Sequence, residues 1–221
     1  MIYQYDETQD LMYENGFYLT SKPYRIGNIL AHYELYKMIT ELPGDVIELG
    51  VFKGGGIIQW GTFRELLENE NSRKIVGFDV FGEFPKVVKI DSDRQFVDSW
   101  NEKFKNEFLS QEDIYNSLRL KGIGNVELIK GDIKDTLPEY LSNNKQMRIS
   151  LLHIDTHVYE PCKLALELLF DRIVPNGVMV FDDYSTIEGE TIAVDEFFEG
   201  KSYMLKKFPF SHNKPSYIIK E

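Results

Sequence analysis

Cysteine is nearly absent from the sequence, since Cys162 is the only one among 221 residues. A single cysteine excludes an internal disulfide framework and suits a reducing compartment. Nothing near Cys162 marks an activated thiol, so we expect it to pack in the core. No apolar run approaches the roughly 20 residues of a membrane helix, and the acidic, tyrosine-rich N-terminus does not resemble a signal peptide. We therefore expect a cytoplasmic protein that makes no membrane contact.

Positive charge is also scarce, because 25 Lys and Arg residues stand against 36 Asp and Glu residues, for a net charge of −11. A strongly acidic protein repels nucleic acid and anionic membranes, so neither is an expected partner. A small molecule or a glycan is the favoured substrate. The hydrophobic content of 43% and aromatic content of 14% are ample for the core of one α/β domain.

A G-x-G-x-x-G dinucleotide fingerprint is missing from the stretch 45–56, which has the sequence DVIELGVFKGGG. The stretch begins as a short apolar strand, turns at several glycines and continues into a helical pattern over 57–67. Glu48 stands two residues before Gly50, where an acid would repel a pyrophosphate and would suit a cationic amino-acid ligand. This favours S-adenosylmethionine (SAM) over NAD. A nicotinamide-dependent oxidoreductase is the alternative enzyme class.

Short apolar runs alternate with helical patterns through the rest of the chain, which predicts a doubly wound α/β sheet with helices on both faces. We expect a mostly parallel, seven-stranded sheet that ends in an antiparallel hairpin. The expected strands are 46–49, 74–80, 126–132, 149–155, 177–181, 203–210 and 216–220, and the expected helices are 25–42, 57–67, 113–121, 133–141, 160–172 and 190–198.

Two segments fall outside this alternation. Residues 1–24 are predicted to be an irregular arm that packs on the 25–221 domain or on a partner subunit, which suggests a homo-oligomer. Residues 81–112 are too long for a simple connection and contain six aromatic residues, so they are predicted to form a lid over the substrate. An extra surface helix over 94–109 is the alternative interpretation.

Acidic residues follow the predicted strands, at the edge of the sheet where α/β proteins bind ligands. Asp79 is placed to accept hydrogen bonds from ribose hydroxyls, or else it is a solvated loop acid. Asp132 is placed to contact an adenine amino group. Asp155 ends a buried strand, and His157 should face the same way because residues i and i+2 of an extended chain share a side. His153, inside that strand, is expected to belong to the core or to support a ligand.

Asp155, Asp182 and Asp183 form an oxygen-rich group without cysteine. Burying several carboxylates together is costly unless a cation compensates, and such ligands suit Mg²⁺, Mn²⁺ or Ca²⁺ rather than zinc. Alternatively, Asp182 and Asp183 cap the following segment or bind water.

Six motifs in this order, spread over residues 25–220, resemble the macrocin O-methyltransferase (TylF) family: IELGVFKGGG, GFDVFGEFP, VELIKGDIKDTLP, LLHIDTHVYEP, PNGVMVFDDY and AVDEFF. The resemblance implies a Rossmann-like class I SAM-dependent methyltransferase fold. It also implies SAM and a divalent metal such as Mg²⁺ as cofactors, and methylation of a sugar hydroxyl, often in the biosynthesis of antibiotics.

The resemblance also implies roles for particular residues. Asp155, Asp182 and Asp183 match the metal ligands, and Asp155 and His157 match the catalytic positions. The residues that match the SAM site are Glu48, Gly50, Val51, Gly54, Gly55, Asp79, Gly131, Asp132 and Asp155.

His157 marks a departure, because the family commonly has an acid at this position, which serves as the general base. A histidine can do the same work, with an ordinary pKa near 6.5. Alternatively, His157 only orients the substrate or a ligand carboxylate. For the whole chain, the second alternative is a non-catalytic partner protein that binds SAM or metal. The acceptor is open between a nucleotide-linked sugar, a glycosylated natural product and a surface polysaccharide.

Overall fold

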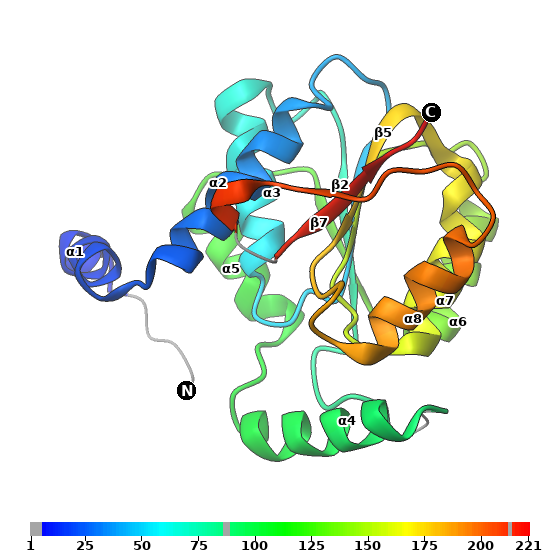
Figure 1. Cartoon of the computed structure of the whole chain (residues 1–221). Helices are drawn as coiled ribbons and strands as arrows, with labels where there is room; N and C mark the ends of the chain where they lie inside the picture. The colour runs from blue at the N-terminus through cyan, green and yellow to red at the C-terminus, as the bar shows by residue number, and fades with distance from the viewer. Residues whose placement is uncertain (1–5, 86–88, 212–213) are drawn as a thin grey trace.

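The computed structural model describes residues 6–85, 89–211 and 214–221, so residues 86–88 of the predicted lid lie outside the described part. A seven-stranded sheet with the order β3-β2-β1-β4-β5-β7-β6 lies between two layers of helices (Figure 1). The strands are β1 (Asp45–Leu49), β2 (Ile75–Asp79), β3 (Val126–Lys130), β4 (Ile149–Ile154), β5 (Ile173–Phe181), β6 (Lys206–Lys207) and β7 (Ser216–Ile219). The α-helices are α1 (Asp10–Thr20), α2 (Pro23–Lys37), α3 (Gly55–Leu67), α4 (Asp91–Phe104), α5 (Gln111–Leu120), α6 (Ile133–Asn143), α7 (Tyr159–Leu169) and α8 (Glu188–Phe198).

The sheet is mixed, so the prediction of a mostly parallel sheet was wrong. Strands β1 to β5 pair in parallel, whereas β7 pairs antiparallel with both of its neighbours, β5 and β6. The cause is the short connection 208–215, whose described residues form the 3₁₀ turn Pro209–Ser211. A parallel return needs a crossover of about a dozen residues or more, so β7 can only come back antiparallel. The predicted terminal hairpin is confirmed by this pairing.

Alternate residues of each strand enter two separate cores, as a period of two requires. Ile47 and Leu49 of β1 pack in the core covered by α6, α7 and α8, while Val46 packs in the core covered by α2, α3 and α5. Figure 1 shows these two groups of helices on opposite faces of the sheet. Glu48 therefore faces α2 and α3 from inside an otherwise apolar strand, and its exposed fraction is 1%.

The described part of the predicted arm, residues 6–24, is mostly helical, not irregular as predicted. The short 3₁₀ turn Glu7–Gln9 is capped by Asp6 and leads into α1, which buries none of its residues. Figure 1 shows α1 standing apart from the α/β body. Its apolar side chains are exposed, Leu19 to 85%, so a contact with a second copy stays a prediction. No helix in the described ranges is long and apolar enough to cross a bilayer.

Arg73 is a buried cation that ties together elements distant in sequence. Its guanidinium makes a bidentate pair with Glu68, at 2.7 and 2.9 Å, and donates to Ser150 Oγ at 2.6 Å. It also donates to the carbonyl oxygens of Ile39, Leu42 and Gly44, so all of its nitrogens are satisfied. The end of α3 is thereby attached to the loop after α2 and to β4.

We expect Arg73→Met to destabilise the fold by about 3–5 kcal/mol, because it leaves the carboxylate of Glu68 buried without its cation, with only the hydroxyl of Tyr36 as a hydrogen-bond donor. Urea unfolding followed by circular dichroism measures the change. The matched control is Arg119→Met, which breaks an exposed pair with Glu112 and should cost less than about 1 kcal/mol. Equal losses in the two variants would show that the buried pair has no special role.

Candidate active site

A cavity of about 420 Å³ opens where the parallel strands end. Chain segments that follow β1, β2, β3, β4 and β5 meet there, as expected for a ligand site of an α/β sheet. The predicted site residues on its lining are Gly50, Asp79, Asp132, Asp155, His157, Asp182 and Asp183.

The turn after β1 requires glycine for two separate reasons. Gly50 has a φ of 92°, and a Cβ on it would lie 2.0 Å from the carbonyl oxygen of Asp155, so β1 and β4 touch at this point. A Cβ on Gly56 would lie 2.3 Å from Glu48 Oε2. The missing side chain lets the Glu48 carboxylate lie against the first turn of α3, where the helix dipole favours negative charge.

Several predicted cofactor residues do not reach the cavity. Val51 is 3% exposed and belongs to the core, and Gly54, Gly55 and Gly131 are not on the lining. Glu48 also lies behind the cavity wall, and burial raises the pKa of its carboxyl group. These residues shape the turns around the cavity, and the structure does not present Glu48 directly to a ligand.

Asp79 and Asp132 reach the cavity and also fix the backbone around it. Asp79 accepts hydrogen bonds from the backbone N–H groups of Phe52, at 2.9 Å, and Phe81, at 2.6 Å. Burial raises the pKa of Asp79, and these hydrogen bonds partly oppose the shift. Asp132 is the N-cap of α6 and accepts from the N–H of Lys134 at 3.0 Å.

His157 meets two of the predicted metal ligands. Its Nδ1 lies 3.1 Å from Asp155 Oδ1 and 2.6 Å from Asp183 Oδ2, so the predicted convergence of Asp155 and His157 is confirmed. All three atoms are buried, and among the described residues none makes a hydrogen bond of regular geometry. Burial lowers the pKa of His157, but hydrogen bonding to Asp155 and the surrounding negative charge outweigh it and raise that pKa overall.

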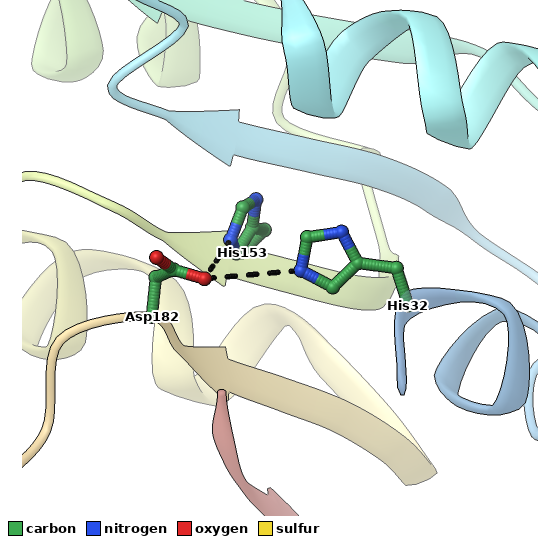
Figure 2. A group of neighbouring side chains, drawn as sticks. All are labelled: His32, His153 and Asp182. Carbon is green, nitrogen blue, oxygen red and sulfur yellow. Dashed lines mark ion pairs between the residues drawn. The ribbon is translucent and has the colours of Figure 1, made fainter. Parts of the chain in front are cut away.

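Asp182 faces a different group of side chains. Its Oδ1 lies 3.8 Å from Nε2 of His32, on α2, and 3.9 Å from Nε2 of His153, on β4 (Figure 2). Asp182 and Asp183 are consecutive residues at the end of β5, and successive side chains of an extended chain point to opposite sides. The predicted set of three carboxylates is therefore divided between two clusters. His32 could have been found from its spacing, because it shares a helix face with the buried residues Leu35 and Tyr36.

Two further charged groups at the site were missed by the sequence analysis. The ammonium group of Lys214 contacts Asp183 Oδ1, and nothing in its local sequence indicates this. Glu190 is fully buried and accepts a hydrogen bond from the N–H of Asp183 at 2.8 Å. A signal for Glu190 does exist, because it lies on the same face of α8 as the buried Ala193 and Val194.

Aromatic side chains from the 81–112 segment surround His157. The ring centroids of Trp100 and Phe96, both from α4, lie 4.9 and 5.1 Å from that of His157, and Phe84 lies at 6.2 Å. Figure 1 shows α4 lying beyond the end of the sheet. The described part of this segment therefore contains a helix, and it also lines the cavity through Phe84, Trp100, Phe104 and Phe108.

We expect Glu190→Gln to stabilise the protein in chelator, and increasingly so as the pH rises. Burial, reinforced by the charge of Asp155, raises the pKa of Glu190 well above its ordinary value of 4.5. An acid whose pKa is higher in the folded than in the unfolded state destabilises the fold as the pH rises from the lower to the higher of these two pKa values. The uncharged amide of glutamine does not titrate and has no such effect. Thermal unfolding between pH 4.5 and 8.5 measures the difference. The exposed Glu188→Gln on the same helix is the control, and a pH-independent difference for Glu190→Gln would contradict the assignment.

Comparison with known proteins agrees with this architecture. A tetracenomycin rhamnosyl 4'-O-methyltransferase of Streptomyces olivaceus is 28% identical over 151 residues, which are 65% of this chain and 54% of that protein, so the match spans about half of the relative. The crystal structure of the calicheamicin methyltransferase CalS11 matches with a TM-score of 0.72 and 23% identity over 98% of this chain and 86% of its own.

The O-methyltransferase NovP matches with a TM-score of 0.76 and 21% identity over 88% of this chain and 80% of its own. These neighbours support a class I methyltransferase-like α/β fold. Residues 27–204 also match the family model described as macrocin-O-methyltransferase (TylF). The chain therefore belongs to the macrocin O-methyltransferase family.

Proposed function

We propose that the protein transfers a methyl group from SAM to a hydroxyl group of a sugar, either nucleotide-linked or attached to a natural product or glycan. The observation that carries the proposal is the cavity at the glycine turn, with acidic residues at the end of each neighbouring strand. Membership of the family supports the reaction class, and the curated relative is named for methylating a rhamnosyl group.

The donor half of the site is built from the turns after β1, β2 and β3. When bound, SAM supplies its methyl group from a sulfonium centre. The cavity fits such a ligand because Gly50 leaves space that a Cβ would fill, and because acids line the wall. Asp79 would accept hydrogen bonds from the ribose hydroxyls, since each carboxylate oxygen has a second lone pair beyond the one it uses for the backbone. Asp132 would lie near the adenine.

The acceptor half is built from Asp155, His157 and Asp183. Their converging buried atoms without regular hydrogen bonds fit an oxygen-preferring divalent cation such as Mg²⁺. When bound, such an ion lowers the pKa of a sugar hydroxyl and fixes its orientation. Asp155 and Asp183 would hold it. The Oδ1 of Asp182 is directed toward the histidines, so only its other oxygen is free to assist. Figure 2 shows that oxygen pointing away from both imidazoles.

His157 would accept the proton of the sugar hydroxyl as the methyl group is transferred. Asp155 and Asp183 lie within 3.1 Å of its Nδ1 and orient the ring. Trp100 and Phe96 pack around the same ring and keep bulk water away from the acceptor. The 81–112 segment thus acts as a lid whose described residues form the apolar wall of the site.

The direct test is transfer of labelled methyl from SAM to a panel of nucleotide-linked deoxysugars and glycosides, with Mg²⁺ present. We expect turnover with at least one acceptor, and a loss of at least about 100-fold in excess chelator, in Asp155→Ala or in Asp183→Ala. Full activity in chelator would reject the metal-assisted scheme while leaving methyl transfer intact. Asp98→Ala, which removes an exposed acid on α4, serves as the control and should keep normal turnover.

One observation favours the non-catalytic alternative, namely that the ammonium of Lys214 contacts Asp183 where a metal ligand is expected. In that case the protein would bind SAM in calorimetry without methylating any acceptor. Lys214→Met separates the two readings, because it should increase Mg²⁺-dependent turnover if the lysine competes with the cation. Methyl transfer by the unmodified protein eliminates the alternative.

We expect His157→Ala to lower the methyl-transfer rate by about 10²- to 10⁴-fold, because it removes the general base, while SAM affinity stays unchanged. His157→Asp should recover part of the rate, since it restores a proton acceptor at the position where the family commonly has an acid. Single-turnover kinetics and calorimetry with SAM measure the two quantities. A His157→Ala enzyme with near-normal rate would remove this residue as the base.

A further inference from the structure

A second polar cluster lies behind the cavity wall, between α2 and the sheet. It consists of His32 from α2, His153 from β4 and Asp182 from the end of β5, and the imidazoles are 3% and 2% exposed (Figure 2). One ligand atom from each residue lies within 4.8 Å of the other two. The reaction proposed above uses neither histidine.

The outer nitrogen of each imidazole is held by a hydrogen-bond acceptor. His32 Nδ1 lies 2.8 Å from Gln59 Oε1, and His153 Nδ1 lies 3.3 Å from Glu48 Oε2. With the amide oxygen of Gln59 and an ionised Glu48 as acceptors, the proton of each neutral ring lies on Nδ1. In the neutral ring this leaves a lone pair on each Nε2.

Both Nε2 atoms point at the same carboxylate oxygen. They lie 3.8 and 3.9 Å from Asp182 Oδ1, within ion-pair range but too far for a hydrogen bond, and both are buried without a hydrogen-bond partner in the described chain. When both imidazoles are neutral, three acceptor atoms converge with no donor between them. Burying unpaired polar atoms in this way is unfavourable, and a cation at their centre removes the cost. Burial lowers the pKa of His153, but Asp182 and Glu48 outweigh it and raise that pKa overall, so a proton on His153 is the alternative to a bound cation.

We propose that His32, His153 and Asp182 form a binding site for a borderline divalent transition metal of the Zn²⁺ class, separate from the oxygen-rich group of Asp155 and Asp183. Zinc binds imidazole nitrogen and carboxylate oxygen at about 2.0–2.2 Å, so two ligands of one ion lie no more than about 4.2 Å apart. The distances from Asp182 Oδ1 to Nε2 of His32 and of His153, 3.8 and 3.9 Å, fall inside that limit, and all three ligand atoms lie within 4.8 Å of one another. Two imidazoles also select zinc, iron or cobalt over Mg²⁺.

The surroundings have the features that support a metal-binding histidine. A hydrogen-bond acceptor at the ring nitrogen that does not bind the metal fixes the orientation of the ring and makes the ligating nitrogen more basic. Gln59 is this acceptor for His32, and Glu48 is this acceptor for His153. Trp60 packs on both rings, with centroid distances of 4.6 and 5.4 Å, and excludes water. The bound ion would fasten α2 to the ends of β4 and β5, directly behind the site where the acceptor binds.

The test uses Co²⁺ as a visible probe in place of Zn²⁺. The full chain is stripped with a strong chelator and titrated with Co²⁺ in millimolar Mg²⁺, with no SAM or acceptor present. We expect one tightly bound equivalent whose absorption bands indicate nitrogen ligands, with Zn²⁺ displacing it. His32→Ala should weaken Co²⁺ binding by at least about 100-fold, and Gln59→Leu, which removes only the outer hydrogen bond, by about 10- to 100-fold. His157→Ala should bind Co²⁺ normally.

The proposal is overturned if the folded wild-type protein binds no stoichiometric Co²⁺, which would mean that a proton on the imidazoles balances the cluster instead. It is also overturned if His157→Ala loses Co²⁺ while His32→Ala keeps it. Should His32→Ala fail to fold, the wild-type spectrum and Gln59→Leu still decide. Because the readout is metal binding without turnover, its outcome is distinguishable from failure of the proposed methyl transfer.

Discussion

The close approach of β1 and β4 at Gly50 is the constraint on which the rest of the site depends. No side chain fits there, because the backbone of Gly50 lies directly against the carbonyl oxygen of Asp155. This contact brings the glycine turn, where a donor would bind, next to the residues that would prepare an acceptor. Methyl transfer requires the two reactants to be held in line at short range, and here the sheet itself provides that proximity. The turns after β2, β3 and β5 complete the cavity around this point.

Much of this arrangement could be predicted from the sequence because it follows from local patterns. The strand, glycine turn and helix over 45–67 are encoded by neighbouring residues, and the acids at the strand ends come together in any parallel sheet. The mixed character of the sheet was missed because no local pattern shows that β7 lies between β5 and β6 and pairs antiparallel with both. Helix α1 was missed because its apolar side chains are exposed and do not gather on one buried face. Lys214 and Glu190 were missed because their partners are distant in sequence or lie across an element boundary.

The pairing of Asp182 with histidines was also not predicted, and the reason is instructive. Motif matching treats Asp182 and Asp183 as one unit, but the alternation of side chains along an extended chain sends them to opposite sides. The same alternation places Glu48 and His153, which are direct partners across β1 and β4, on the face covered by α2 and α3. Asp182 joins that face. The polar residues of the α2 side were visible in the sequence only as isolated residues within apolar strands.

The two clusters are therefore joined by a single peptide bond at the end of β5. Asp183 faces Asp155 and His157 at the cavity, while Asp182 faces His32 and His153 behind it. A cation bound between the histidines would attract the carboxylate of Asp182 and so hold in place the backbone from which Asp183 projects. Glu48 connects the same cluster to the first turn of α3 on the donor side. A change behind the cavity wall can in this way alter both halves of the site, although none of the residues involved except Asp182 lines the cavity.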